Sequence, residues 1–147
     1  MIGGMVNFSF GVPEHGWLEF KISDIKNEVV LDTSDVPNNH LQELTIALNR
    51  LREGSLQEEV EFSLEPDFAL CRFKVNNEFI DIEIYPNGSR LNPIQFSGLR
   101  SKVMHSVYKS LRDLESLDIW KHPDCDEKYW SWNFPHSELN AFKNRNV

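Results

Sequence analysis

Residues 122–136 contain side chains of the types that bind zinc. Nitrogen, sulfur and oxygen ligands are offered within this short stretch by His122, Asp124, Cys125, Asp126 and His136. A dependable zinc signal needs two close ligand pairs, whereas His122 and Cys125 form one pair with no second pair nearby. The spacing therefore favours a polar loop over a zinc site, and we predict no metal and no cofactor.

Motifs of the common enzyme classes are missing from the sequence. There is no Gly-rich phosphate loop, no Gly-x-Ser-x-Gly elbow, no Cys-x-x-Cys and no His-Glu-x-x-His. Asp32, Ser34 and Asp35 bring two carboxylates and a hydroxyl close together in the sequence, as a catalytic site could use them. Ser, Asp and Asn before a helix usually cap it, however, so we expect capping. The sequence therefore predicts no catalytic residue, and an unrecognised enzyme stays open as an alternative.

Acidic side chains recur on one face of three strands expected at residues 58–64, 69–75 and 80–84. If these strands pair in chain order, Arg72 and Lys74 on the middle strand lie between acids of both neighbours. The acids are Glu59 and Glu61 on one side and Asp81 and Glu83 on the other. Cross-strand ion pairing is one explanation, and a patch that contacts a protein partner is the other.

Aromatic residues crowd into a Pro-interrupted C-terminal stretch, namely Trp120, Tyr129, Trp130, Trp132 and Phe134. Either these rings fold back and are buried, or they form an exposed anchor for a partner, because Trp and Tyr dominate interface hot spots. In the second case the predicted contacts are Trp130 and Trp132 with the neighbouring acids Asp124, Asp126 and Glu127.

Hydrophobic periodicity predicts the elements of the first half. Alternation of apolar and polar residues predicts strands at 6–10, 17–22 and 28–32. Leucines at helical spacing then predict a helix that ends at Gly54, with Asn39 as its N-terminal cap.

The second half repeats this order. The three strands of the acidic face are followed by a helix expected at about 97–117. Short motifs shared by the halves indicate an internal duplication. We therefore predict one α+β domain over 1–147. Two strand-strand-strand-helix units, 1–54 and 55–117, form a mostly antiparallel sheet with helices on one face, and 118–147 is an aromatic-rich C-terminal segment.

Composition and charge restrict the partners. The formal net charge of −8 disfavours nucleic acid and anionic membranes and favours a basic protein partner. The start of the sequence lacks the features of a secretory signal, and no apolar run is long enough for a membrane span. Cys71 lies in an apolar strand, so it and Cys125 are expected to be reduced thiols. We expect a cytoplasmic protein.

Residues 34–39, the leucines at 41, 44 and 48, and the Glu65-Pro66 pair resemble a loosely defined group of small, acidic, uncharacterised bacterial α+β proteins. In size, acidity and lack of catalytic motifs the chain also resembles immunity proteins of bacterial toxin systems. This resemblance implies neutralisation of a basic toxin enzyme, and it implies no particular functional residue. Alternatives are a small-molecule-binding domain or enzyme with a cleft between sheet and helices, and a homo-oligomeric structural protein.

Overall fold

The computed structural model describes residues 5–144, in which runs of strands separated by helices form an α+β fold. In chain order the elements are β1 (Asn7–Phe10), β2 (Trp17–Ser23), β3 (Glu28–Ser34), α1 (His40–Arg52), β4 (Gln57–Ser63), β5 (Phe68–Asn76), β6 (Phe79–Tyr85), β7 (Ile94–Leu99), α2 (Arg100–Glu115), η1 (Asp118–Lys121), α3 (Cys125–Lys128) and α4 (His136–Asn144).

The strands form two antiparallel sheets, with orders β1-β2-β3 and β4-β5-β6-β7. Each sheet is a meander in which neighbours along the chain pair, so the predicted antiparallel pairing is confirmed. The expectation of one sheet gives way to two, because β3 and β4 contact each other without pairing as strands. The predicted duplication stays a prediction, and the second sheet has one strand more than the first.

The helix expected at about 97–117 begins later, since residues 94–99 form β7. In β7 the side chain of Phe96 and the Gly98 position are buried, while Gln95 and Ser97 are exposed. This alternation has a period of two and fits a strand. The apolar stripe that predicted the helix included Leu99, which belongs to β7, so the expected start at about 97 is wrong and the helix begins directly after β7.

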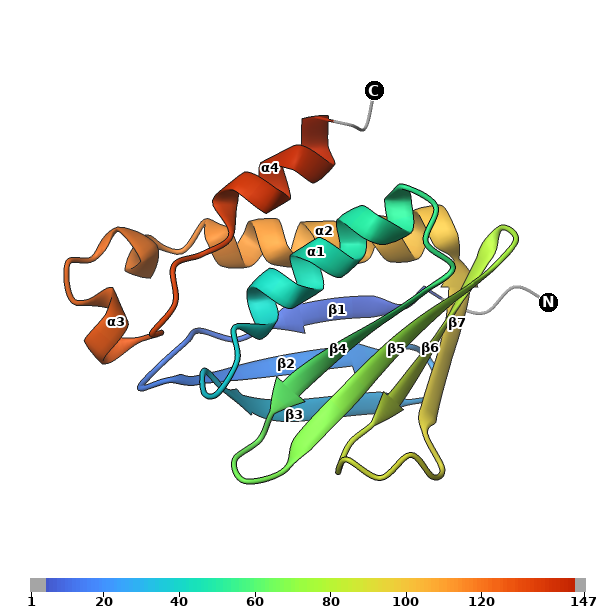
Figure 1. Cartoon of the computed structure of the whole chain (residues 1–147), viewed down its shortest axis with the longest axis horizontal. Helices are drawn as coiled ribbons and strands as arrows, with labels where there is room; N and C mark the ends of the chain where they lie inside the picture. Colours follow the sequence, from blue (N-terminus) through green and yellow to red (C-terminus); the bar gives the residue numbers. More distant parts are fainter. Residues whose placement is uncertain (1–4, 145–147) are drawn as a thin grey trace.

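A shared hydrophobic core joins the sheets, the helices and the C-terminal segment. The Phe20 ring of β2 stacks on Phe62 of β4 with centroids 4.8 Å apart, which fastens one sheet to the other. Helix α1 lies along β4, α2 lies along β1, and α4 packs on both helices (Figure 1). Asn39 caps α1 as predicted, because its side chain accepts a hydrogen bond from the Gln42 backbone N–H.

Candidate functional site

The acidic face of β4–β6 is compensated within the protein. Arg72 on β5 lies directly between Glu59 and Glu83, as the predicted register requires. Its Nε donates to Glu59 at 2.6 Å, and a terminal nitrogen lies 3.5 Å from Glu83. Arg90 also reaches Glu59 at 3.3 Å, and Lys74 lies 3.7 Å from Glu83. The predicted ion pairing is therefore confirmed on this face.

These contacts change the titration of Glu59. Burial alone would raise the pKa of Glu59, but hydrogen bonds and charges from Arg90 and Arg72 outweigh it and lower the pKa. Asp81 accepts a hydrogen bond from the Ser97 hydroxyl at 2.8 Å. Among the described residues, the Glu61 carboxylate alone of the four predicted acids has no ion pair or hydrogen bond. Most of this patch is thus occupied by contacts inside the protein.

The aromatic segment divides between the core and the surface. Trp130 is 1 % exposed, and its ring meets the His40 ring edge-on with centroids 5.3 Å apart. The prediction of Trp130 as a surface contact therefore does not match its position, because the indole fills the core beside α1. Trp132 is 38 % exposed and remains on the surface.

Asp35 fastens this segment to the first sheet. Its carboxylate, buried with the residue 6 % exposed, accepts hydrogen bonds from the Ser131 backbone N–H at 2.8 Å and the Ser131 hydroxyl at 2.6 Å. The indole N–H of Trp132 donates to the Asp35 carbonyl at 2.6 Å. The expected capping role of Asp35 is wrong, since Asn39 caps α1 and Asp35 binds a segment far along the chain.

Three partly exposed apolar residues are linked to Asp35 by chain adjacency or by hydrogen bonds. Its backbone N–H donates to the Gly16 carbonyl at 2.9 Å, which places Trp17 and Val36 at the same end of the sheet. The exposed fractions are 43 % for Trp17, 44 % for Val36 and 38 % for Trp132. Gly16 is needed here, because its φ is +82° and an added Cβ would lie 2.9 Å from the Asp35 carboxylate. We call this surface, formed by Trp17, Val36 and Trp132, the Asp35 corner.

Removing the Asp35 carboxylate should loosen the segment. We expect Asp35→Ala to lower the free energy of unfolding by about 2 kcal/mol, because both Ser131 donors lose a buried acceptor. Urea denaturation followed by far-ultraviolet circular dichroism measures the change. Asp35→Asn keeps an acceptor oxygen and should cost less, and equal effects of the two substitutions would contradict this role.

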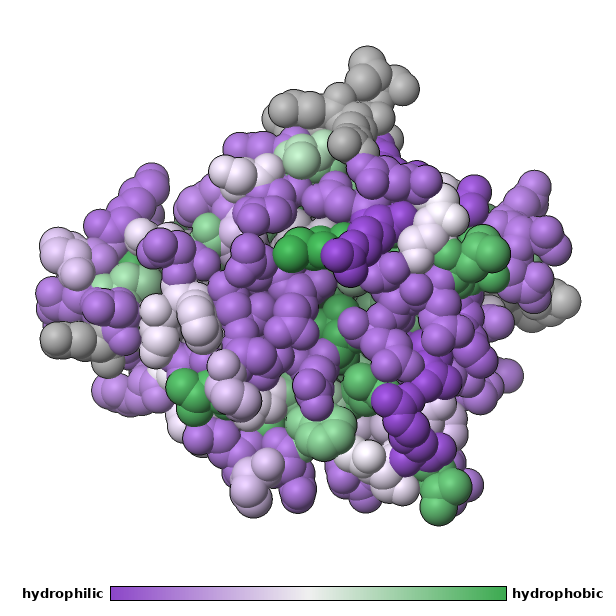
Figure 2. Space-filling model, in the orientation of Figure 1, coloured by the Kyte–Doolittle hydropathy of each residue, from purple (hydrophilic) through white to green (hydrophobic). Residues whose placement is uncertain are grey.

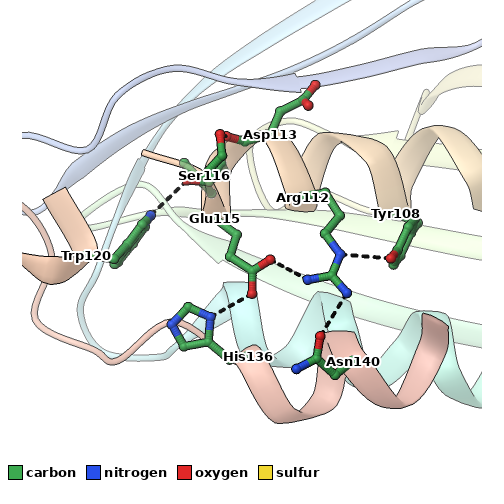
Figure 3. Close-up of polar contacts among 9 residues, drawn as sticks. Tyr108, Arg112, Asp113, Glu115, Ser116, Trp120, His136 and Asn140 are labelled. Atoms are coloured by element: carbon green, nitrogen blue, oxygen red, sulfur yellow. Dashed lines mark hydrogen bonds and ion pairs between the residues drawn. The ribbon is translucent and has the colours of Figure 1, made fainter. Parts of the chain in front are cut away.

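A second set of polar contacts joins α2 to α4 (Figure 3). Glu115 accepts from Arg112 and lies 2.6 Å from Nδ1 of His136, and Arg112 also donates to Tyr108 and to Asn140, each at 2.8 Å. Burial alone would raise the pKa of Glu115, but the hydrogen bonds from His136 and Arg112 outweigh it and lower the pKa. His136 therefore takes part in the polar contacts that join α4 to α2.

The other side chains that could bind zinc have separate contacts and do not gather at one point. Asp124 pairs with Lys128 at 3.2 Å, the His122 ring packs against Tyr129, and Asp126 is exposed. Glu127 was predicted to contact a partner, but its side chain lies outside the described residues. Among the described side chains, no group of three or more His, Cys, Asp or Glu is arranged to hold a metal ion.

Three spaces bear on the small-molecule alternative. Between the helices and the second sheet there is an apolar cavity of only about 10 Å³, lined by Leu44, Phe73 and Val107 among others. A hollow of about 590 Å³ lies under the C-terminal segment, where Trp120, Cys125 and Trp132 contribute to its wall. A third space, a hollow of about 270 Å³, lies between β1 and α2, where Phe10 and Leu114 contribute to its wall. Little space therefore remains between the helices and the second sheet, and the two larger of these spaces lie beside the first sheet and under the C-terminal segment.

Comparison with protein-family models, with curated proteins and with solved structures finds no match. Among residues 5–144, no helix combines the length and apolar character needed to cross a bilayer. The chain is thus an α+β protein of two antiparallel meanders.

Proposed function

We propose that this protein is a protein-binding module of the immunity or antitoxin type, which neutralises a basic enzyme by covering its active cleft. The observation that carries the proposal is the Asp35 corner, where two tryptophans and a valine are partly exposed and the Trp132 indole is held by a hydrogen bond to Asp35. Rigid aromatic side chains of this kind are the usual anchors of protein interfaces.

Fixed geometry supports a binding role for the corner. The Trp132 indole is oriented by its hydrogen bond to Asp35, so little side-chain entropy remains to be lost on association. By contrast, the view of α1 and β4–β6 in Figure 2 is mostly hydrophilic, and its acids are largely paired with arginines. On that acidic face Phe68 and Phe79 are also partly exposed, but most of the acids there are already paired within the protein. The corner differs in presenting two tryptophans.

The charge of the chain supports a basic partner. A net charge of −8 accelerates encounter with a cationic surface, an effect that weakens as salt is added. Apolar contacts at the corner then slow dissociation, which is the step that usually separates tight from weak complexes.

Binding of the purified protein to a panel of basic toxin domains tests the proposal. We expect one tight complex, weakened about 30-fold by Trp17→Ala, since hot-spot truncation costs 2 kcal/mol or more. The affinity can be measured by biolayer interferometry at two salt concentrations. Leu56→Ala, which truncates a 70 % exposed apolar side chain outside the corner, is the matched control. Failure of every basic domain to bind would reject the proposed function.

A small-molecule-binding role is the second candidate, favoured by the hollow under the C-terminal segment. It predicts that a ligand contacts the exposed edge of Trp132 and the neighbourhood of Cys125. Binding of metabolites can be followed by changes in the NMR signals of these two residues. Shifts confined to the hollow, together with no response to basic proteins, would favour this candidate.

A further inference from the structure

The backbone of β3 is bonded to β2 on one side only. On the side of β2 that faces away from β3, the Glu19 carbonyl accepts a hydrogen bond from the Gly11 N–H at 2.9 Å. The backbone N–H and C=O of Glu19 therefore face β1. Because bonded and non-bonded pairs alternate in an antiparallel ladder, Phe20 faces β3. The same alternation turns the N–H and C=O groups of Val30 and Asp32 away from β2, toward the outer edge of the sheet.

This edge is open. Within residues 5–144, the backbone groups of Val30 and Asp32 have no hydrogen-bond partner, and Val30 is 47 % exposed. In Figure 1, β3 is the outer strand of the first sheet; it pairs only with β2, and Ser34 at its end donates a hydrogen bond to Glu65 beyond β4. An exposed strand edge of this kind is a template for pairing with another extended chain.

Other outer strands have contacts along their edges. The Phe8 N–H of β1 donates to the Ser106 hydroxyl of α2 at 3.3 Å, and β4 is flanked by α1. On β7, the Gln95 carbonyl accepts a hydrogen bond from the Asn27 side chain at 3.4 Å. Each of these edges thus has at least one such contact, whereas the outward backbone groups in the middle of β3 have none among the described residues.

The acidic side chains beside the open edge of β3 favour a positively charged partner. Glu19 lies directly opposite Asp32 on the outer face of the first sheet, and like charges so placed repel. Neither carboxylate has an ion-pair or hydrogen-bond partner among the described residues, and the neighbouring Lys21 pairs with Glu28 at 3.4 Å. On the second sheet, by contrast, the equivalent row places Arg72 between its two acids.

Charge also argues against a second copy of this chain as the occupant. A self-paired β3 would bring Asp32 and Glu28 of one copy close to the same acids of the other. A segment with lysine or arginine at alternating positions would instead place cations beside the Glu19 and Asp32 carboxylates. Val30 and Trp17, both partly exposed on the same face, would contact the aliphatic stems of these lysine or arginine side chains.

We infer that the open edge of β3 receives an extended, basic segment of a protein partner, which adds as a fourth strand to the β1-β2-β3 sheet. The inference rests on the proposed function for the choice of a protein partner, and it specifies the mode of recognition. Backbone hydrogen bonds to Val30 and Asp32 provide the attachment, and the Glu19 and Asp32 carboxylates provide the preference for cations.

A synthetic octapeptide of alternating lysine and valine, blocked at both ends, tests this mode. Its titration into the intact, isotope-labelled protein should slow hydrogen exchange of the Val30 and Asp32 amides by about tenfold or more at saturation. The Leu31 amide, already bonded to β2, is an internal control and should not change. A peptide with glutamate in place of lysine should bind much more weakly.

Two variants separate edge pairing from general attraction. Val30→Pro removes the outward N–H and is expected to weaken the lysine peptide about tenfold, whereas Val30→Thr should bind like the wild type. Asp32→Lys leaves the backbone edge in place and should abolish the preference for the lysine peptide, because the new cation pairs with Glu19. This second variant keeps the test decisive should the proline variant fail to fold.

Several outcomes would overturn the inference. These are no binding at millimolar peptide, binding that leaves the Val30 and Asp32 amides unprotected, equal affinity for both peptides, and protection that rises with protein concentration alone, which would indicate a second copy. Basic toxin domains that bind through the Asp35 corner without protecting these amides would reject the edge and keep the proposed function. Peptide protection without binding of any basic protein would do the reverse.

Discussion

Replacing Trp130 with alanine is expected to lower the free energy of unfolding by about 3–5 kcal/mol, the usual cost of truncating a large buried aromatic side chain. Trp130 is 1 % exposed and is among the largest fully buried side chains of the protein. Its ring contacts His40 at the start of α1, so it attaches the C-terminal segment to the core. Urea denaturation monitored by circular dichroism avoids the loss of the tryptophan signal in the variant.

Trp130→Phe is the matched control for this substitution. The indole N–H of Trp130 is buried without a hydrogen-bond partner among the described residues, so phenylalanine removes a polar group that gains nothing from burial. The phenylalanine variant should therefore lose much less stability than the alanine variant. A loss below about 1 kcal/mol for Trp130→Ala would show that the segment is not part of the cooperative core.

The strand pattern could be predicted from the sequence because each central strand has one buried and one exposed face. In β5, Cys71 and Phe73 alternate with Arg72 and Lys74, and the short turn at Asn77 fixes the register with β6. The position of Arg72 between acids of both neighbours followed from this register. Local periodicity was sufficient here because the contacts join neighbouring strands.

The short strand β7 could not be found in the same way. Its inward positions include Gly98, which has no side chain to mark a buried face, and Phe96 alone resembles the beginning of the following apolar stripe. The split into two sheets likewise depends on how β3 packs near β4 without pairing with it, which no local pattern records. Tertiary packing decided these features.

The candidate site was the least predictable part, because it depends on contacts between distant segments. Asp35 and Ser131 are separated by 96 positions in the chain, and neither residue type indicates the other. In the sequence Trp17 is an outward residue of an alternating strand, and nothing in the pattern indicates that residues 36 and 132 lie at the same end of the sheet. For Trp130, composition indicated an aromatic segment but could not tell a buried ring from an exposed one.

Both sheets have acidic residues on their outer faces, and the second sheet places a cation of its own between two of these acids. On β4–β6 the acids surround Arg72, so their repulsion is relieved within the protein. On β2 and β3, Glu19 and Asp32 face each other without a cation between them. A basic partner at the first sheet would thus relieve a repulsion that the second sheet relieves internally, which is why we assign recognition to the first sheet.

Acidification is expected to destabilise the protein through His40, whose side chain is completely buried. The Thr33 hydroxyl donates to the Leu18 carbonyl at 2.6 Å, so it accepts from Nε2 of His40 at 2.9 Å and leaves Nδ1 as an unpaired acceptor. A proton on Nδ1 would place a charge beside Phe62 and the rest of the core. Desolvation by burial accordingly lowers the pKa of His40 from 6.5 to about 3.

The sign of the effect follows from proton binding. Between pH 6.5 and 3 the unfolded chain carries a proton on His40 that the folded protein does not, so stability falls as pH falls. Each pH unit in this window removes about 1.4 kcal/mol, and wild type should lose about 3 kcal/mol more than His40→Phe between pH 7 and pH 4. Urea denaturation at both pH values measures this difference, and His105→Gln, at an exposed position on α2, should behave like the wild type. Parallel pH profiles of wild type and His40→Phe would show that His40 takes up its proton without disturbing the core.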